Sequence, residues 1–438
     1  MEKYFVSASY RRDASSRFAE GERWGNFGSI GAAWLISEEY FLSDVPWINL
    51  LKLKVSWGVQ GNDNLYPNAT YARKYYPYAD NYTHSYNENT GEYSLTLAYK
   101  GNPDLTWESS EAFNVGVDFE IFGSYLNGSI EYFSRKTTDM LYSKDVPLSS
   151  GNPTGYYPVN VGSVLNNGFE SSFYGDIFST RNVHWSWNLN MSHYRNRILS
   201  LDPSVAKDGI KGSNFIYKVG GSLYEAYMYK YAGVDHDTGK ALYYYTDEEG
   251  KMSITDEFSI AEQFECGSVL PKIYGGLGTT LRVYGFDLSA QFSYQFGGRY
   301  YDGTYQSLMH TDSAVGSAWH KDVLKAWTKE HPHSDIPRLD GDTSVGQSAV
   351  DRFLISSDYI SINNVTVGYT IPHKLLSKLH IASLRVYFAA DNLAVTSARK
   401  GVDPRFSMGL GSYTSGSGLN SGSYSAMRTL TGGVTLTF

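Results

Sequence analysis

Hydrophobic and polar residues alternate one by one in many stretches of this chain. In the clearest stretch, Phe286–Phe296, aromatic and aliphatic side chains alternate with Asp, Ser and Gln. Successive side chains of a β-strand point to opposite faces, so this stretch predicts a strand with one apolar and one polar face. The final stretch, Arg428–Phe438, has the same pattern and ends on an aromatic residue.

Twelve segments of this kind are predicted as strands, each about as long as a strand that crosses a bilayer at a tilt. A Lys or Arg side chain at the lipid midplane costs roughly 2–4 kcal/mol, and Asp or Glu costs less. The apolar faces are therefore expected to point outward, toward lipid. The segments are Lys3–Tyr10, Trp24–Ile36, Leu50–Gln60, Glu111–Ile121, Tyr125–Lys136, Leu165–Phe178, His184–Arg197, Tyr274–Val283, Phe286–Gly297, Tyr359–Thr370, Ser383–Leu393 and Arg428–Phe438.

The connections between these segments are of two kinds. Three are tight turns, at Ile121–Tyr125, Phe178–Val183 and Val283–Phe286. Short turns on one side and long extracellular loops on the other are typical of outer-membrane barrels. The pattern predicts an all-β protein, a transmembrane antiparallel β-barrel of about twelve strands with its C-terminus on the periplasmic side. The long connections are Gly61–Ser110, Thr137–Val164, Ile198–Ile273, Arg299–Asp358 and Ala394–Met427.

Three of the long loops have recognisable local patterns. Ser317–Thr328 predicts a short helix with its first residue as N-cap, and Pro332 prevents the helix from continuing. Ser407–Ser425 is rich in Gly and Ser and is expected to be a mobile loop. Leu242–Thr246 predicts a small strand between two turns, at Asp237–Gly239 and Glu248–Gly250.

Composition supports many strands joined by turns. The 438 residues include 38 Tyr, 9 Trp and 43 Gly but 13 Pro, and membrane interfaces select amphipathic aromatic residues. The longest apolar run, Ile30–Ile36, is far shorter than the roughly 18 residues that a membrane helix needs. The net charge of −8 disfavours nucleic acid as a partner, and the single Cys266 excludes an internal disulfide. Met1–Tyr10 lacks the features of an export signal.

Nine short motifs follow one another along the chain. They are RRDASSRF at Arg11–Phe18, LLKLKVSWGVQGN at Leu50–Asn62, NPDLTWESSEAFNVGVDF at Asn102–Phe119, NVGSVLNNGFE at Asn160–Glu170, YAGVDHDTGK at Tyr231–Lys240, DIPR at Asp335–Arg338, NNVTVGYTIP at Asn363–Pro372, ADNLAV at Ala390–Val395 and GVDPR at Gly401–Arg405. In this order they resemble the SusC-like (SusC/RagA) branch of the TonB-dependent outer-membrane transporters. Ala14 stands where that family usually has glycine, and Arg405 stands where it usually has an acidic residue.

The resemblance implies a plugged barrel of about 22 strands, of which residues 1–438 are expected to be the C-terminal part. It implies that the signal peptide, the TonB-contacting segment, the plug domain and roughly ten earlier strands are missing here. It also implies a SusD-like surface lipoprotein as a lid, and energy from the TonB complex through the missing plug. An open sheet is not viable in lipid, because each unpaired backbone group costs several kcal/mol. The chain is therefore expected to be part of a larger barrel or, alternatively, to close a smaller one by itself.

No nucleotide or calcium site is predicted. Gly233–Ala241 has five residues between its glycines where a phosphate-binding loop has four, and Ala241 stands where Ser or Thr would bind magnesium. Asp235 and Asp237 are expected to form a turn, since Thr246 stands where an EF-hand has its last Glu.

No metal site, catalytic site or cofactor is predicted either. The histidines of one loop show no regular ligand spacing and are expected to be solvated; they are His310, His320, His331 and His333. Ser397–Lys400 has the Ser-x-x-Lys spacing of some acyl-transfer enzymes but lacks their partner motifs. Enzymatic function is therefore not expected.

Aromatic side chains in two long loops are the candidate ligand-binding residues. Flat rings stack on sugar faces or peptide side chains while the hydroxyl or indole N–H group forms hydrogen bonds. The same side chains suit an interfacial belt or a protein partner, so ligand, partner and structural roles stay open. The candidates are Tyr71, Tyr75, Tyr76, Tyr78, Tyr82, Tyr86, Trp319 and Trp327.

The resulting hypothesis is a non-enzymatic protein of the outer membrane of a Gram-negative cell. It would form the wall, in contact with outer-membrane lipid, and the extracellular loops of a SusC-like importer of oligosaccharides or peptides. The alternative is a self-closing small barrel that acts as a passive porin or adhesin, and a third possibility is a soluble all-β binding module. Since loop aromatics serve sugars, peptides and partner proteins alike, the substrate class stays open.

Overall fold

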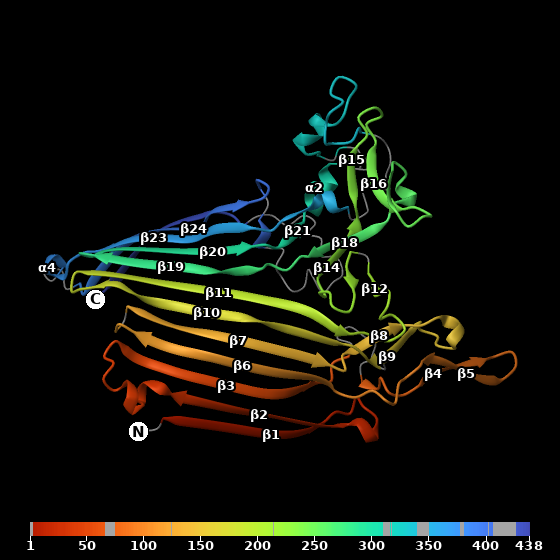
Figure 1. Ribbon diagram of the computed structural model, residues 1–438, viewed down its shortest axis with the longest axis horizontal. Helices are drawn as coiled ribbons and strands as arrows, with labels where there is room; N and C mark the ends of the chain where they lie inside the picture. Colours follow the sequence, from red (N-terminus) through yellow and green to blue (C-terminus); the bar gives the residue numbers. More distant parts are fainter. Residues whose placement is uncertain are drawn as a thin grey trace. The chain divides into compact units, whose positions relative to one another are not determined.

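Twelve long strands form one antiparallel sheet in the computed structural model of the chain (Figure 1). The structure describes residues 3–65, 75–123, 125–212, 214–309, 316, 318–339, 350–376, 381–401, 403–405 and 426–438. Each strand coincides with one of the predicted amphipathic segments to within a few residues, so the twelve predicted strands are confirmed. They are β1 (Tyr4–Ala14), β2 (Trp24–Leu35), β3 (Ile48–Asn62), β6 (Glu108–Ile121), β7 (Leu126–Thr138), β10 (Ser163–Ser179), β11 (Val183–Ser200), β19 (Ile273–Val283), β20 (Phe286–Phe296), β23 (Tyr359–Thr370), β24 (Ser383–Ser397) and β25 (Thr429–Thr437).

Neighbours in this sheet follow the order β1-β2-β3-β6-β7-β10-β11-β19-β20-β23-β24-β25. The order is that of the sequence, so the twelve strands form an up-and-down meander. Tight turns join β6 to β7, β10 to β11 and β19 to β20. The connections from β3 to β6, β7 to β10, β11 to β19, β20 to β23 and β24 to β25 are long. The predicted alternation of tight turns and long loops is therefore confirmed.

The remaining elements are short and lie in the connections. The shorter strands are β4 (Asn81–Asn87), β5 (Glu92–Tyr99), β8 (Leu141–Asp145), β9 (Tyr156–Asn160), β12 (Ile210–Lys211), β13 (Ile216–Tyr217), β14 (Glu225–Tyr229), β15 (Tyr231–Val234), β16 (Ala241–Thr246), β17 (Met252–Thr255), β18 (Gln263–Ser268), β21 (Arg299–Tyr301) and β22 (Leu354–Ser356). The helices are α2 (Gly303–Leu308), α4 (His373–Leu376), η1 (Glu20–Glu22), η2 (Ile36–Glu38), η3 (Tyr40–Leu42), η4 (Leu148–Ser150), η5 (Phe258–Ile260), η6 (Lys321–Lys325) and η7 (Asp351–Phe353). Within the described ranges, none of these helices has the length and apolar character needed to cross a membrane.

Internal contacts divide the chain into two compact units. Unit 1 consists of Met1–Phe173, Tyr194–Gly209 and Lys218–Gly221. Unit 2 consists of Tyr174–His193, Ile210–Tyr217 and Ser222–Phe438. Strands β1 to β9 belong to unit 1 and strands β12 to β25 to unit 2, while β10 and β11 have residues in both.

In unit 1 the strand register places polar and apolar side chains on opposite faces of the sheet. Lys54 of β3, Gly116 of β6 and Glu131 of β7 lie in one row across the strands. The next positions along β3 point to the other face, where Val55 and Trp57 stay 39% and 43% exposed. An exposed apolar face opposite a charged face is what a barrel wall requires, because one side contacts lipid and the other contacts water.

Aromatic side chains surround a carboxylate in the connection between β2 and β3. Glu39 accepts hydrogen bonds from the Tyr4 hydroxyl at 2.5 Å, Trp34 Nε1 at 3.0 Å and Lys3 Nζ at 3.1 Å. These donors, the Tyr4 hydroxyl above all, lower the pKa of Glu39 to about 2. Tyr and Trp side chains with a polar anchor are typical of the aromatic belt at a membrane interface.

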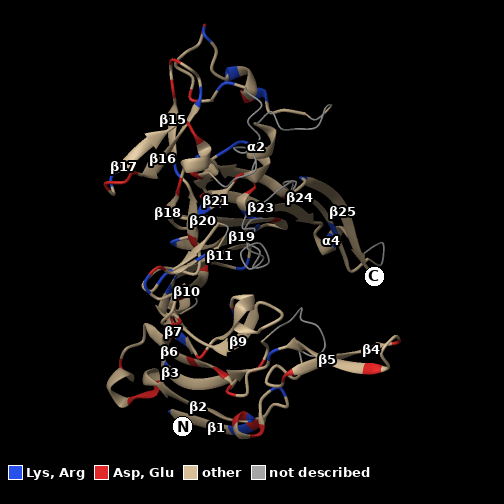
Figure 2. Ribbon diagram, turned by 90° about the vertical axis from the view of Figure 1, so that its right-hand side faces the viewer, with Lys and Arg blue, Asp and Glu red and all other residues tan. Residues whose placement is uncertain are grey.

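In unit 2 the long connections fold into a small domain at one end of β19, β20 and β23 (Figure 1). Its sheets pair β14 with β18, β16 with β15 and β17, and β21 with β22. The predicted strand Leu242–Thr246 is confirmed as part of β16, and Figure 2 shows charged residues in red and blue at the tip beside β17. The buried core of this loop domain comprises Phe215, Ala226, Met228, Tyr243, Val269, Tyr301, Val350 and Phe353.

The predicted helix Ser317–Thr328 is shorter than expected. The structure has the 3-10 helix η6, whose N-cap is His320; its Nδ1 accepts the backbone N–H of Asp322 at 3.1 Å. The helix ends because Ala326 adopts an extended ψ of 153° and the next N–H donates to Ile336 O. Ser317 and the predicted mobile loop Ser407–Ser425 lie outside the described residues.

Candidate functional site

A hollow of about 940 Å³ lies on the polar face of unit 1. Its floor includes one row of small side chains, Ser9, Ser29, Gly58 and Ala112, and Arg135 stands at the end of this row. The hydroxyls of Ser9 and Ser29 lie 2.7 Å apart. A Cβ at Gly58 would lie 3.0 Å from the Cβ of Ser29, so this floor has no room for larger side chains. The volume is within the usual range of small-ligand pockets.

Charged side chains of both signs stand around this hollow. Arg135 donates through Nε to Ser110 Oγ at 2.7 Å, and Arg11 Nε lies 2.6 Å from Asp13 Oδ2. Glu170 of β10 also lines the hollow and is exposed. Within the part of the chain that the structure describes, the side chain of Glu170 has no hydrogen bond or ion pair. The hollow therefore offers a guanidinium and an uncompensated carboxylate.

Two of the motifs that resemble the SusC-like family, Arg11–Phe18 and Asn102–Phe119, come together at the long-loop end of unit 1, and the first of them also contacts Asp63, the residue after β3. Ser15 Oγ donates to Asp63 Oδ2 at 2.7 Å, and Arg17 Nη1 donates to Asp63 Oδ1 at 3.2 Å. The ring of buried Phe18 packs against Trp107, with ring centroids 5.5 Å apart. These motif residues hold the bases of two loops together, which is a structural role.

The Asn160 side chain joins two further connections of unit 1. Its Nδ2 donates to Thr106 O at 2.8 Å and to Asp139 O at 2.9 Å, while its Oδ1 accepts the N–H of Thr106 at 2.8 Å. Asn102 Nδ2 donates to Pro158 O at 2.8 Å. Both amides replace main-chain partners where the backbone is irregular, and so fix the end of the loop that carries the predicted tyrosines, just before β6.

Two of the predicted tyrosines stand on a hairpin that the sequence analysis did not foresee. Strands β4 and β5 pair with each other and project beyond the ends of β3 and β6 (Figure 1). Tyr82 and Tyr86 of β4 share one face with Tyr93 and Leu95 of β5, and these four side chains are 53% to 74% exposed. The signal for the hairpin was the alternating segment Asn81–Asn87, which lies inside a long loop. This exposed patch is the aromatic face of the hairpin.

The other predicted tyrosines lie before the hairpin. Tyr75 and Tyr76 are exposed, and the rings of Tyr76 and Tyr78 meet edge to face with centroids 6.4 Å apart. Tyr71 lies outside the described residues.

The two predicted tryptophans belong to unit 2 and have different surroundings. Trp327 Nε1 donates to His236 O at 3.0 Å. Its ring lies against Gly239, where a Cβ would lie 2.3 Å from the ring. Trp319 is exposed. The ring of Trp327 thus packs inside the protein against Gly239, whereas the exposed ring of Trp319 can contact a ligand or a partner protein.

The polar groups near Trp327 form turns. Asp235 Oδ2 accepts a hydrogen bond from Thr238 Oγ1 at 2.6 Å, as expected for the predicted turn. The rings of His236 and His333 lie 5.1 Å apart, and His236 Nδ1 lies 2.7 Å from Pro332 O. Among the described residues, no group of three or more His, Cys, Asp or Glu side chains is placed to hold a metal ion.

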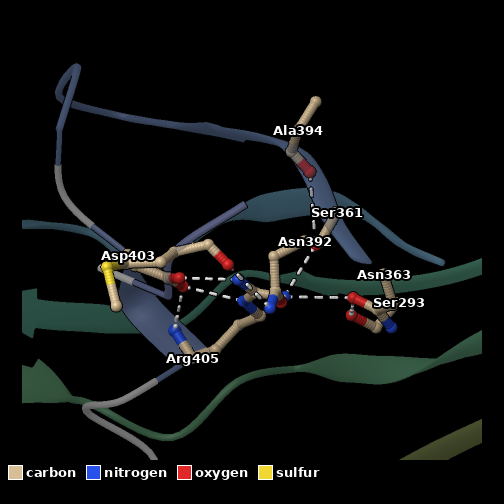
Figure 3. A network of polar contacts seen from close by, with 8 residues as sticks. Ser293, Ser361, Asn363, Asn392, Ala394, Asp403 and Arg405 are labelled. Carbon is tan, nitrogen blue, oxygen red and sulfur yellow. Dashed lines mark hydrogen bonds and ion pairs between the residues drawn. The ribbon is translucent and has the colours of Figure 1, made fainter. Parts of the chain in front are cut away.

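A polar network in unit 2 joins the segment after β24 to the strands of the sheet (Figure 3). Arg405 is its centre, and it donates to Asp403 Oδ2 through Nη2 at 2.6 Å and to Oδ1 through Nε at 2.8 Å. Its Nη1 donates to Ser361 Oγ at 2.9 Å and Asn363 Oδ1 at 3.1 Å, with Asn392 Oδ1 at 3.4 Å. Burial raises the pKa of the Asp403 carboxyl, but the hydrogen bonds from Arg405 outweigh this effect and lower it.

Two irregularities in the strands make this network possible. Asn363 is an extra residue of β23, since Ile362 and Asn364 pair with consecutive residues of β20. Asn392 of β24 has a left-handed backbone with φ of 50°. The sequence marked Arg405 as a departure from the family pattern, but strand periodicity alone does not show which strand residues bulge to meet it.

A second arginine of the same segment contacts the loop domain. Arg399 Nε lies 2.8 Å from Oδ2 of the buried Asp302, and the guanidinium lies 3.4 Å above the ring of Tyr305. Asp302 also caps α2 by accepting the N–H of Tyr305 at 3.0 Å. The segment that contains Arg399 and Arg405 therefore ties two long connections to each other and to the sheet.

Comparison with known proteins gives consistent matches over all or most of the chain. A family model described as "TonB dependent receptor-like, beta-barrel" matches residues 1–393. The chain is 29% identical to TonB-dependent receptor P26 of Formosa agariphila, over 100% of this chain and 45% of that protein. It is 27% identical to TonB-dependent receptor SusC of Bacteroides thetaiotaomicron, over 94% of this chain and 40% of that protein.

Solved structures agree with these sequence matches. A structure titled "Structure of the RagAB peptide transporter" matches with a TM-score of 0.80 and 27% identity, over 100% of this chain and 46% of that chain. The same importer in its "open-open" state matches with a TM-score of 0.81. The chain spans less than half the length of these relatives. The resemblance found in the sequence motifs is confirmed.

Proposed function

Because this chain belongs to the TonB-dependent receptor-like β-barrel family, whose members lie in the outer membrane, we propose that it forms wall and extracellular loops of a nutrient importer. The observation that carries this proposal is the end-to-end match to SusC and RagAB-type transporters at the C-terminal side of larger proteins. The twelve-stranded sheet, with one apolar and one charged face, fits the wall of a pore. The protein has a transport role and no catalytic role.

We propose that the chain is the C-terminal part of a barrel whose other strands and plug domain lie elsewhere. Its length, less than half that of its relatives, supports this division. The sheet order begins with β1 and ends with β25, and the backbone groups at both ends need partners in lipid. Energy from the TonB complex would reach this wall through the plug.

The substrate is proposed to be an oligopeptide or an oligosaccharide. The name RagAB peptide transporter supports the first class, and the similarity to SusC supports the second. Trp319 is the predicted tryptophan whose ring is available for such a ligand.

The aromatic face of the hairpin is proposed to contact a SusD-like lipoprotein that covers the long loops. A two-stranded hairpin is marginally stable alone, and a patch of exposed aromatic and aliphatic side chains indicates a contact surface. The base of the hairpin is fixed, because the Asp80 carboxylate accepts hydrogen bonds from Lys100 Nζ at 2.9 Å and from the backbone N–H of Gly101 at 2.9 Å. Lys100 first, and then Gly101, lower the pKa of Asp80, so the carboxylate stays charged. A rigid base and an open face favour docking.

Uptake by whole cells tests the proposed function. A strain that lacks the gene for this chain is compared with its complemented parent for uptake of fluorescent oligopeptides and oligosaccharides. The importer proposal predicts that uptake of one class falls to background and that a protonophore stops it in the parent. Uptake that persists with the protonophore but requires the chain would show a passive pore, and unchanged uptake of both classes would overturn the proposal.

A further inference from the structure

We propose that three cationic side chains on the apolar face of unit 1 bind the phosphate group of an outer-leaflet lipid. They are Lys136 of β7 and Arg195 and Arg197 of β11, close to the long-loop ends of these strands. The apolar face of the wall meets lipid and the long loops of such barrels are extracellular, so this rim lies beside the outer leaflet. The site is independent of the proposed import function, since it faces the membrane and not the pore.

The strand pairs place Lys136 on the apolar face. Phe113 of β6 pairs with Trp57 of β3 on one side and with Ser134 of β7 on the other, so these three side chains share one face of the sheet. This is the face on which Trp57 is exposed. Lys136 is two positions beyond Ser134 and therefore points the same way.

Side-chain contacts of β10 extend the same face to β11. Phe169 of β10 packs against Tyr132 of β7, whose ring is on the apolar face, with ring centroids 5.1 Å apart. Asn166 of β10 has the opposite orientation, and its Oδ1 accepts a hydrogen bond from Asn196 Nδ2 at 2.7 Å. Asn196 therefore points to the polar face. The two arginines on either side of it in β11 point to the apolar face.

The three cations are close enough to share one phosphate-bearing headgroup. Strand β10 lies between β7 and β11, so the axes of these two strands are roughly 10 Å apart. Counting along the strands from the contacts of Phe169 and Asn166 places Lys136 and Arg197 on either side of Leu165, which is uncharged. Arg195 is two positions from Arg197, roughly 7 Å along the strand. Lys and Arg side chains bridge such distances, and a guanidinium binds phosphate through paired hydrogen bonds.

No counter-ion accompanies these cations among the described residues. All three side chains are exposed, and within the described ranges none has a hydrogen bond or an ion pair. Glu111 of β6 stands in register with Lys136, but its Oε1 accepts a hydrogen bond from Trp57 Nε1 at 2.7 Å. A cluster of like charges attracts an ion of opposite sign, so this rim favours an anionic group.

The residues of β7 on the apolar face follow the order of the layers of a membrane. Toward the long-loop end they are Ile130, Tyr132, Ser134 and Lys136, which change from aliphatic to aromatic, hydroxyl and cationic. Aromatic side chains prefer the membrane interface, and Lys and Arg are attracted to anionic headgroups beyond it. Phe169, beside Tyr132, is 55% exposed and offers apolar surface to acyl chains. The cations therefore lie at the depth of lipid phosphates, which favours a lipid over a free phosphate ion.

Native mass spectrometry of the assembly that contains the chain, purified in detergent, tests this proposal. The probes are lipid A that carries one phosphate group, the same lipid A after removal of its phosphate by a phosphatase, and inorganic phosphate. The parent protein is expected to bind phosphorylated lipid A about tenfold or more tightly than the dephosphorylated form. Inorganic phosphate is expected not to displace the lipid, because buried acyl chains add to its binding.

Paired variants locate the bound lipid. Arg195→Gln combined with Arg197→Gln is expected to weaken the binding of phosphorylated lipid A by about tenfold or more. Arg195→Lys combined with Arg197→Lys keeps both charges and should retain most of the binding, and Lys136→Gln should weaken it less than the glutamine pair does. Arg181→Gln is the matched control, since it removes a charge in the exposed turn at the other end of β10 and β11. Equal amounts of assembled protein on heat-modifiable gels show that all variants fold.

The outcomes separate a lipid site from its alternatives. Equal binding of the two forms of lipid A, or unchanged binding in the glutamine pair, overturns the site. Displacement of the lipid by inorganic phosphate alone would show a simple anion site and overturn the lipid assignment. An equal loss of binding in Arg181→Gln would show an effect of net charge and also overturn it. Nutrient uptake by whole cells is a separate measurement, so the lipid site and the import function can fail independently.

Discussion

Arg385 of β24 binds Asp287 of β20 across Gly368 of β23, the strand between them. Its Nε donates to Oδ1 at 3.0 Å and its Nη2 donates to Oδ2 at 2.5 Å. Gly368 pairs directly with Asp287, and a Cβ on this glycine would lie 2.5 Å from Arg385 Nη2. The glycine thus provides the space through which an ion pair spans three strands on the polar face.

Unit 1 contains the same arrangement. Lys54 and Glu131 form an ion pair at 3.3 Å across Gly116, which lies in register between them. A Cβ at Gly116 would lie 3.0 Å from Lys54 Cε. Ion pairs that cross a glycine thus connect non-adjacent strands in both units.

Substitution of Gly368 by alanine should destabilise the sheet by about 1–3 kcal/mol, because the added methyl group forces the ion pair apart. Thermal unfolding in detergent, followed by circular dichroism and by heat-modifiable gel mobility, measures the change. Gly432→Ala in β25 is the control, since a Cβ there meets no atom within 4 Å. Equal destabilisation by both changes would show that strand glycine itself, and not the space for the ion pair, matters.

Replacement of Arg405 by glutamate, the type of residue usual in the family, should detach the segment after β24. Asp403 is 2% exposed at its side chain and would lose its only recorded ion-pair partner among the described residues. Removing one partner of a buried ion pair costs about 3–5 kcal/mol. Limited proteolysis should therefore cut this segment faster in Arg405→Glu than in Arg405→Lys. Equal cleavage rates in both variants and the parent would contradict the role assigned to the network.

The Glu39 cluster predicts a dependence of stability on pH. The pKa of Glu39 is about 2 in the folded protein and 4.5 normally. As the pH falls, Glu39 therefore binds a proton in the unfolded chain before it does so in the folded protein. The stabilisation is complete above pH 4.5 and disappears as the pH falls toward 2. Unfolding measured at several pH values should show a parent that loses more stability across this window than Glu39→Gln does. Parallel curves for the two proteins would contradict this assignment.

The two tryptophans should separate structural and ligand roles. Trp327→Ala removes an indole hydrogen bond and a ring packed on Gly239, and should destabilise the loop domain by about 1–3 kcal/mol. Trp319→Ala should leave stability unchanged, because its ring is exposed. Hydrogen exchange of the loop domain measures both. Faster exchange in Trp319→Ala than in Trp327→Ala would reverse the two roles.

The aromatic face of the hairpin should control association with the lipoprotein. Replacing Tyr93 and Leu95 by serine is expected to reduce co-purification of the partner without loss of folded transporter, since both side chains are largely exposed. Ser94→Ala, on the opposite face of β5, is the matched control. Undiminished co-purification of the double variant would show that the partner docks elsewhere.

The sequence was sufficient for the large sheet but not for the networks at its loop end. Period-two patterning located β20 and β25 because each strand has one apolar and one polar face. The same rule did not identify β4. Its aromatic and polar residues do alternate, but they lie within a long loop rich in tyrosine, where the pattern does not stand out. The bulge at Asn363 breaks the period by one residue, so pattern reading could not place the side chain beside Arg405.

The candidate ligand residues show the same limit. Composition singled out Tyr82 and Trp327 equally, but only tertiary packing reveals that one ring is open and the other lies on Gly239. The hollow beside Arg135 was not foreseen either, because its floor is made by small residues from four strands. Each of those residues is unremarkable in the sequence, and only the register brings them into one row.

Refolding of the 438-residue chain into lipid tests the central claim, that these strands are part of a larger importer wall. Heat-modifiable gel mobility and single-channel conductance are measured for the chain alone and for the chain refolded with the N-terminal barrel and plug of a SusC-like relative. We expect no compact, heat-sensitive form from the chain alone and its appearance in the mixture. A compact, heat-sensitive form that inserts and conducts as the chain alone would contradict the claim and establish a self-closing barrel.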